Sequence, residues 1–236
     1  MGIYDRDYYR TPPRRQLSLP MWSVTSWLIF LNIAVFFTDR VFLKGLLAGW
    51  GYFSATAAID YLQVWRFITF QFLHADLGHL VFNMLSLYFF GRLVENYLGS
   101  RRYIAYYLLA GVGGAVLYLL LLYSRVLGYD PRIPMVGASA GIFGILLGAA
   151  YIAPNARVMM LFPPIPVKLR TLAWIFVGIA VYIILSHGRN AGGEAGHLGG
   201  AVVGYILIRR PYLLNFMAPG RRRSSSYFPN GPWHRS

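Results

Sequence analysis

The composition of this 236-residue chain excludes an ordinary soluble domain, because 57% of its residues are apolar and only 13% are charged. Soluble proteins average about 45–50% apolar and about 25% charged residues. The net charge of +14 would suit nucleic-acid binding in a soluble protein. Here the positive charges lie between apolar runs and at the chain ends, so we expect membrane topology to explain them and no nucleic-acid partner. Without cysteine, the chain forms neither disulfides nor thiolate metal sites.

Six apolar runs predict the fold class. They are residues 22–37, 77–98, 103–123, 139–153, 171–186 and 196–213. So many runs leave too little polar sequence to cover them, which predicts an all-α membrane protein with a compact six-transmembrane-helix bundle over residues 21–213. We expect residues 1–20 to be a polar cytoplasmic segment rather than a cleaved signal peptide. Residues 214–236 are expected to form a basic, disordered cytoplasmic tail in contact with membrane lipids.

The positive residues also predict the orientation of the bundle. If the N-terminus is cytoplasmic, 15 of the 22 Lys and Arg residues fall in inside segments, six fall outside, and Arg92 lies within a span. This bias predicts that both termini are cytoplasmic. The aromatic segment 39–76 then lies outside, where amphipathic rings suit the membrane–water interface.

Four polar residues within the apolar runs form the candidate site: His79, Asn83, Ser139 and His197. Such residues are unfavourable in a membrane and therefore require an explanation. Spans two, four and six all run from outside to inside in the predicted topology. All four side chains consequently lie near the same outer depth, which predicts a single site there.

Ser139 lies in the glycine-flanked sequence 137–141, Gly-Ala-Ser-Ala-Gly. Taken alone, this pattern could equally be a small-residue surface for helix packing. Because Pro134 stops the preceding structure, we expect Ser139 in the first turn of the fourth helix, where free N–H groups favour negative charge. That run extends only ~22 Å at 1.5 Å per residue, short of the ~30 Å membrane core. Ser139 should therefore lie below the membrane surface, in a cavity that water enters.

His197 opens the sixth run, and Gly200 and Gly204 offer a small face on which the fourth helix can pack. This packing would bring His197 within hydrogen-bond reach of Ser139, whose hydroxyl needs a base to become a nucleophile. The alternative is a neutral histidine bonded to nearby backbone. Glu194 could orient His197, but we expect it in the exposed outer loop and predict a Ser–His dyad rather than a triad.

His79 and Asn83 are four residues apart and therefore share a helix face. Both side chains can donate hydrogen bonds to the oxyanion of an acyl-transfer reaction, although a polar clamp between helices is the alternative. A zinc site on His74, His79 and His197 is disfavoured, because the spacing matches no metalloprotease motif and no acid is well placed.

Together these motifs resemble the rhomboid intramembrane proteases over about residues 20–213, and residues 21–213 would be the protease domain. The catalytic pattern is carried by Gly137 with Ser139 and by His197 with Gly200 and Gly204. The supporting positions as a whole run from the first outer loop to the sixth span: Trp65, Arg66, His74, Glu95, Gly137, Phe143, Gly200 and Gly204. Phe143 stands where some bacterial members have a tyrosine stacked on the catalytic histidine, and Gly196 stands where alanine is commoner.

The resemblance implies a simple six-helix bacterial type in the cell (inner) membrane, without metal or cofactor. Its substrates would be transmembrane proteins, cut in or beside a membrane helix. By carry-over, Ser139 is the nucleophile and His197 the base, while the Ser139 backbone N–H, His79 and Asn83 stabilise the oxyanion. The rival interpretations are a catalytically silent rhomboid-like protein that binds membrane helices, and a small transporter, which would need charged residues throughout the bundle.

Overall fold

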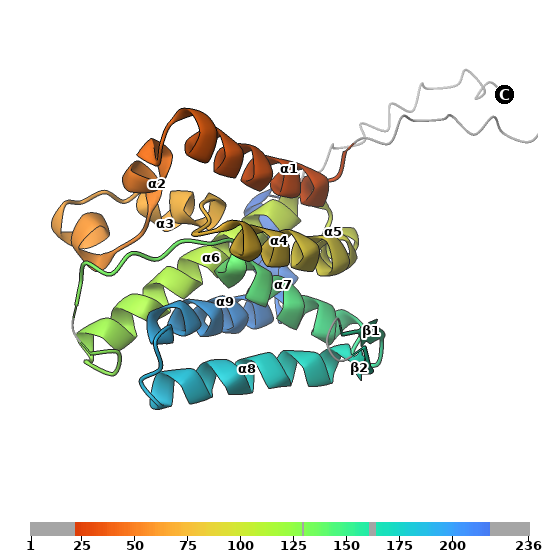
Figure 1. Ribbon diagram of the computed structural model, residues 1–236. Helices are drawn as coiled ribbons and strands as arrows, with labels where there is room; N and C mark the ends of the chain where they lie inside the picture. The colour runs from red at the N-terminus through yellow and green to blue at the C-terminus, as the bar shows by residue number, and fades with distance from the viewer. Residues whose placement is uncertain (1–21, 129, 161–163, 218–236) are drawn as a thin grey trace, which may run out of the picture.

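The computed structural model describes residues 22–128, 130–160 and 164–217 (Figure 1). Each of the six predicted apolar runs contains a helix. In chain order these helices are α1 (Val24–Phe37), α4 (Leu77–Ser86) with α5 (Arg92–Leu98), α6 (Ser100–Tyr123), α7 (Ser139–Ile152), α8 (Leu169–Leu185) and α9 (Ala191–Arg209).

Three helical runs in the described part of the chain are long and apolar enough to cross a membrane. They are Val24–Phe42, Leu77–Leu98 and Ser100–Tyr123, while α7 and α8 are apolar but shorter. The first two runs each include a π-helical turn, Thr38–Phe42 after α1 and Leu87–Gly91 between α4 and α5.

Short elements fill the connections between these helices. The segment between α1 and α4 contains α2 (Leu46–Gly51), the π-helical turn Thr56–Asp60, α3 (Arg66–Thr69) and the 3-10 turn Phe70–Phe72. An antiparallel hairpin of β1 (Arg157–Met159) and β2 (Pro166–Lys168) joins α7 to α8, with Val158 opposite Val167.

The predicted C-terminal tail begins later than residue 214. After α9, residues Pro211–Met217 form a 3-10 helix, and the Leu214 side chain is fully buried. A leucine that packs against the bundle holds this part of the chain in a defined conformation. Residues 1–20 and the rest of the predicted tail, 218–236, lie outside the described residues.

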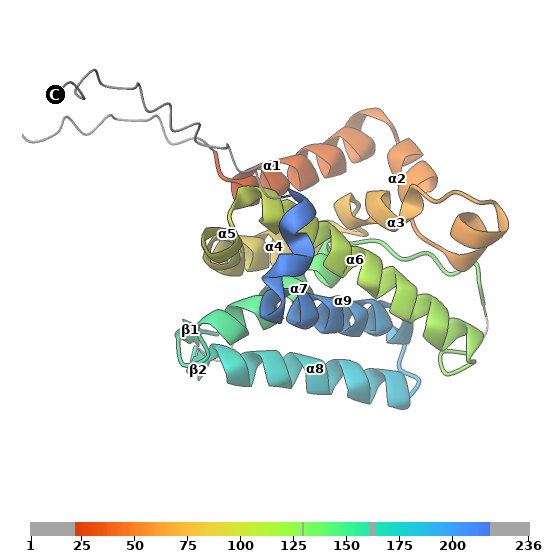
Figure 2. The same ribbon diagram turned by 180° about the vertical axis from the view of Figure 1, so that it is seen from behind.

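The centre of the bundle is formed by α6, α7 and α9, which pack against one another (Figure 2). Glycines permit the close approach of α9 to α7. A Cβ atom on Gly200 would overlap the carbonyl oxygen of Ala140, and one on Gly204 would overlap the Cα atom of Gly144. The predicted small face of the last helix therefore meets the helix that begins at Ser139, and this contact sets the position of His197.

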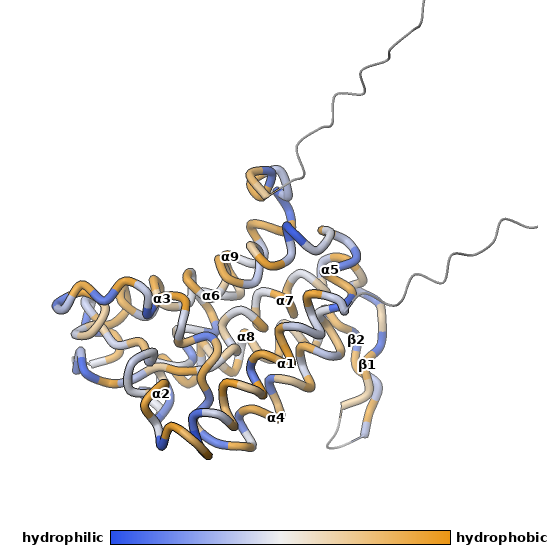
Figure 3. Tube along the Cα trace, turned by 90° about the horizontal axis from the view of Figure 1, so that it is seen from above, coloured by the Kyte–Doolittle hydropathy of each residue, from blue (hydrophilic) through white to orange (hydrophobic). Residues whose placement is uncertain are grey.

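Large apolar side chains also cover the outside of the molecule. Trp27 and Phe30 on α1 are about half exposed, and Trp174 and Tyr182 on α8 are more exposed still. Figure 3 shows hydrophobic segments distributed over the outer helices rather than confined to the interior. Exposed apolar side chains favour an apolar solvent, and helices are compatible with lipid because each satisfies its own backbone hydrogen bonds.

Glu95 fastens three helices at one end of the bundle. Its carboxylate accepts hydrogen bonds from the backbone N–H groups of Val24 and Thr25, at 2.9 and 3.0 Å. The hydroxyls of Thr25 and Ser100 donate to it as well, at 2.7 and 2.9 Å. The first N–H groups of α1 have no partner within their own helix, so this buried carboxylate satisfies them and joins α1 to α5 and α6.

Candidate active site

The backbone before α7 turns sharply to bring Ser139 beside α4. Gly137 has a φ of +132°, a conformation that favours glycine. A Cβ atom at Gly137 would lie only 2.7 Å from Cε1 of His79. The backbone N–H of Gly137 donates to the carbonyl of Phe70 at 3.0 Å, which fixes the turn. Glycine at position 137 therefore allows His79 to stand next to the start of α7.

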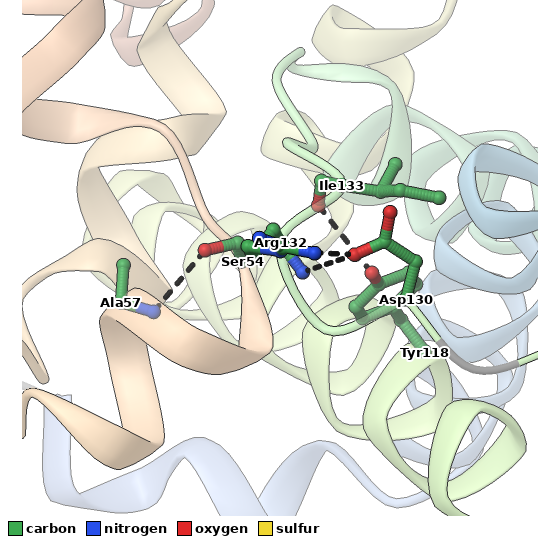
Figure 4. Close-up of polar contacts among 6 residues, drawn as sticks. All are labelled: Ser54, Ala57, Tyr118, Asp130, Arg132 and Ile133. Atoms are coloured by element: carbon green, nitrogen blue, oxygen red, sulfur yellow. Dashed lines mark hydrogen bonds and ion pairs between the residues drawn. The ribbon is translucent and has the colours of Figure 1, made fainter.

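The segment that leads to Ser139 is anchored to neighbouring elements. Phe53 and Met135 form an antiparallel bridge, with N–H to carbonyl distances of 3.0 and 2.7 Å in the two directions. Figure 4 shows the hydroxyl of Tyr118, on α6, directed at the carbonyl of Ile133, to which it donates at 3.4 Å. The nucleophile candidate thus follows a strand-like segment held from both sides.

Ser139 and His197 are in direct contact. The Oγ atom of Ser139 lies 2.9 Å from Nε2 of His197, within the range in which a base takes a hydroxyl proton. The ring of Phe143, one turn into α7, stacks on the His197 ring at 4.2 Å with an interplanar angle of 7°. The structure therefore brings together the predicted serine and histidine, and Phe143 stacks on the imidazole at the position where some family members have a tyrosine.

Glu194 is not in an exposed loop, and this expectation from the sequence is wrong. The helix α9 begins at Ala191, five residues before the predicted apolar run, so Glu194 falls in its first turn. Its Oε2 atom lies 2.8 Å from Nδ1 of His197, and its side chain is only 12% exposed. The two residues are three apart on a helix and hence share a face.

A cavity of about 610 Å³ opens at this point, and all four predicted residues line it: His79, Asn83, Ser139 and His197. Apolar side chains of α7 and α8, among them Phe176, form another part of its wall. The buried side-chain nitrogen of Asn83 has no hydrogen-bond partner among the described residues. An unsatisfied buried donor beside a cavity is available to a ligand or reaction intermediate.

The sequence did not reveal Phe176, nor the segment 188–193, as parts of this wall. Phe176 is one of many apolar residues in α8, and no pattern distinguishes it from its neighbours. Segment 188–193 is glycine-rich, which indicates a turn but gives no contact.

Trp65 and Arg66 organise the first loop instead of lining the cavity. Arg66 is buried and donates to the carbonyl of Tyr52 and to Oε1 of Gln63, both at 2.6 Å. Its guanidinium also lies 4.6 Å from the centre of the Tyr52 ring. Trp65 stacks on Trp50 at 5.3 Å. These contacts hold the loop compact around a buried cation.

His74 packs edge-on against His79, with ring centres 5.1 Å apart. The pKa of His74 is lowered to about 3, mainly by burial and in smaller part by the nearby His79, while Asp76 opposes the shift. His74 is therefore neutral at physiological pH and supports the His79 ring by packing. Within the ranges the structure describes, no three His, Asp or Glu side chains gather closely enough to hold a metal ion.

The fold and site define a class: an apolar helical bundle with a serine–histidine pair in an internal cavity. Residues 61–210 match the Rhomboid domain, which is more than half of the chain, so the chain belongs to the rhomboid family. Family membership and the apolar helices make it an integral membrane protein.

Three relatives illustrate the similarity. The chain is 32% identical over 202 residues to RHOMBOID-like protein 12, mitochondrial, of Arabidopsis thaliana. The aligned residues cover 80% of this chain and 58% of the relative. This chain is 30% identical over 220 residues to Rhomboid protease AarA of Providencia stuartii, covering 85% and 76% respectively. It is 33% identical over 166 residues to Rhomboid protease GluP of Bacillus subtilis, covering 69% of this chain but 29% of that protein.

Because some relatives are named as mitochondrial or chloroplastic, a location in a bacterial inner membrane stays a prediction.

Proposed function

We propose that this chain is an intramembrane serine endopeptidase that cleaves peptide bonds in or beside the transmembrane helices of other membrane proteins. The observation that carries the proposal is the 2.9 Å contact between Ser139 Oγ and His197 Nε2 beside a cavity of about 610 Å³. The names of two relatives, Rhomboid protease AarA and Rhomboid protease GluP, support the same activity.

The proposed chemistry follows from the positions of the two side chains. His197 Nε2 takes the hydroxyl proton of Ser139 as Oγ bonds to the scissile carbonyl carbon, and the carbonyl π electrons move to oxygen. His197 then gives this proton to the amide nitrogen as the C–N bond breaks, which leaves an acyl ester on Ser139. Water attacks the ester and gives a proton to His197, and Ser139 Oγ recovers that proton as the acid product leaves.

The oxyanion would be stabilised by donors from two helices. Asn83 and His79 on α4 line the cavity beside Ser139, and the side-chain nitrogen of Asn83 is a free donor among the described residues. The backbone N–H of Ser139 lies at the start of α7, where helix N–H groups lack internal partners and the dipole favours negative charge. Such donors stabilise the transition state more than the ground state.

The proposed topology has six spans, with both termini cytoplasmic and Ser139 facing the outer side. The 14 residues of α7 reach only ~21 Å, less than the ~30 Å apolar core, which supports a nucleophile below the surface. Replacing Ser139 with Cys introduces a unique thiol, because the chain has none. A membrane-impermeant thiol reagent should label this variant from the outer side alone; labelling from the cytoplasmic side alone would reverse the topology.

The test of the function uses the purified full chain and a fluorophosphonate probe. Wild type should be labelled and should cleave a reconstituted single-span membrane protein, whereas Ser139→Ala should do neither. The matched control is Ser124→Ala, which removes an exposed hydroxyl at the end of α6 and should keep both activities. If Ser139→Ala cleaves as wild type does, the serine-protease proposal fails. If wild type is not labelled and does not cleave, a silent helix-binding protein is the better interpretation.

A further inference from the structure

We propose that Glu194 is a positioning residue for His197, so that this chain uses a Ser–His–Glu triad rather than a dyad. This inference rests on the proposed function and adds a third side chain to the same site. The carboxylate acts through the imidazole: His197 lines the cavity, whereas Glu194 is not among the described residues that do.

The geometry of the three groups is continuous. Glu194 Oε2 lies 2.8 Å from His197 Nδ1, and Ser139 Oγ lies 2.9 Å from Nε2 on the opposite side of the ring. The side chains of Glu194 and His197 are 12% and 17% exposed, so little water competes for their contact. Asn190 donates to the other carboxylate oxygen at 3.3 Å, which helps to fix the rotamer of Glu194.

This arrangement determines which imidazole nitrogen carries the proton. An ionised carboxylate accepts hydrogen bonds and donates none, so Nδ1 of His197 must be the donor in this contact. Nε2 of the neutral ring then keeps its lone pair and accepts the Ser139 hydroxyl, as a general base requires. The stacked ring of Phe143 restricts rotation of the imidazole out of this plane.

The carboxylate also stabilises the charge that forms during the reaction. When His197 takes the serine proton, the imidazole becomes a cation 2.8 Å from a negative oxygen. Because both side chains are largely shielded from solvent, this attraction is stronger than it would be in bulk water. The proton stays on the imidazole, and Glu194 remains ionised throughout, as the acid of a serine-protease triad does.

A purely structural role for Glu194 has to be separated from this one. An acidic side chain in the first turn of a helix stabilises the helix through a favourable interaction with its dipole, whether or not a histidine is near. Glu194→Gln removes the charge but preserves size and polar contacts, so a structural role alone would change stability and leave the chemistry of Ser139 unaffected.

The experiment measures how fast a fluorophosphonate labels Ser139 in the purified full chain at a series of pH values. In this reaction the Oγ–P bond forms, fluoride leaves with the P–F electrons, and His197 takes the hydroxyl proton. For Glu194→Gln we expect the maximal labelling rate to fall at least about tenfold. The upper bound is about 10⁴-fold, the loss when the triad acid of a soluble protease becomes an amide. The probe concentration for half-maximal rate should stay unchanged.

The pH profile supplies the readout that a structural role would not move. Without the carboxylate, protonation of the imidazole is less favourable, so the acidic limb of the profile should shift to lower pH in Glu194→Gln. His79 on α4 and Arg189 before α9 face the same cavity and are present in both proteins, so the difference reports on Glu194. Glu194→Asp, which keeps the charge on a shorter side chain, should recover part of the rate and the wild-type acidic limb.

The matched control is Asp130→Asn, which removes a carboxylate without contact to His197. Asp130 is half exposed and pairs with Arg132 in the loop before α7 (Figure 4). This variant should keep the wild-type rate and profile. Equal rates and profiles for wild type and Glu194→Gln would overturn the triad while leaving the serine protease intact. Absence of Ser139-dependent labelling in wild type would instead reject the proposed function.

Discussion

The two glutamates of this chain, Glu95 buried and Glu194 partly buried, have different surroundings. Glu95 accepts only from backbone N–H groups and hydroxyls of α1 and α6, all of them groups that hold helices together. Glu194 contacts the imidazole of His197, whose other nitrogen meets Ser139 beside a cavity. The function of a carboxylate within an apolar bundle can therefore be inferred from its partners. A carboxylate whose oxygens accept from backbone N–H groups and hydroxyls holds helices together. A carboxylate next to a titratable ring beside a cavity is a candidate for a role in the chemistry.

The largest effect should come from replacing His197, the partner of Glu194 beside the cavity. His197→Ala should lower the cleavage rate by about 10⁶, because loss of the base disables a unit that depends on all its members. The double variant Ser139→Ala, His197→Ala should be scarcely slower than either single variant in an assay with a reconstituted single-span substrate. Additive losses would mean that the two side chains do not act as one unit.

Asn83→Ala should give the next largest effect. Loss of one oxyanion donor typically lowers kcat by about 10² to 10³. His79 and the Ser139 backbone N–H would remain, so activity should persist at a reduced level. Steady-state kinetics separate the possibilities, because a raised KM with an unchanged kcat would assign Asn83 to substrate binding instead.

Glu95→Ala should act on stability and leave the chemistry of the folded protein intact. It removes the acceptor for two backbone N–H groups and two hydroxyls, so the free energy of unfolding should fall by about 3 kcal/mol. Unfolding by titration with a denaturing detergent measures the loss, and the fluorophosphonate rate per folded molecule should match wild type. Glu194→Gln is the natural counterpart, with a changed labelling rate and a near-normal unfolding midpoint. If both variants changed only the labelling rate, or both changed only the unfolding midpoint, the two glutamates would not differ in the way proposed.

The smallest effect concerns His74, which supports the site by packing. Its pKa is about 3 in the folded protein, compared with about 6.5 for an unperturbed histidine. The unfolded chain binds the proton more readily, so the stability from the neutral ring is fully present above about pH 6.5 and is lost as the pH falls toward 3.

His74→Phe should therefore show a flatter decline of the unfolding midpoint below about pH 6.5 than wild type. The other acid-sensitive groups are common to both proteins, so the difference between the two curves reports on His74. Parallel curves would show that His74 takes up no excess proton on unfolding.

The contact between Ser139 and His197 was predictable from sequence because membrane-spanning segments restrict which residue types they contain. Polar side chains in apolar runs are rare enough to be noticed, and the glycines at positions 200 and 204 indicated which helix face would pack closely. Covalent spacing along a helix then placed His79 and Asn83 on one face.

The contact of Glu194 with His197 was considered and set aside at the sequence level, because local propensity favours a loop at its position. Gly192 and Gly193 are poor helix formers, so apolar pattern alone starts the last helix near Gly196. In the structure these residues are helical, and Gly192 lies against the Tyr118 ring of α6, a tertiary contact that no local pattern records. The burial of Arg66 likewise depends on the carbonyls of Tyr52 and Gly49, which lie 14 and 17 positions away in the chain.

The bridge between Phe53 and Met135 has a consequence for how sequence variation in this chain should be distributed. Phe53 is fully buried and lies 86 positions from Ser139 in the chain, yet its backbone pairs with the residue four positions before the nucleophile. A saturation screen for activity should therefore show a second band of intolerant positions in the first loop, around Phe53. Those positions would look catalytic in the screen although Phe53 is not among the described residues that line the cavity, since their contribution would be to hold Ser139 in place.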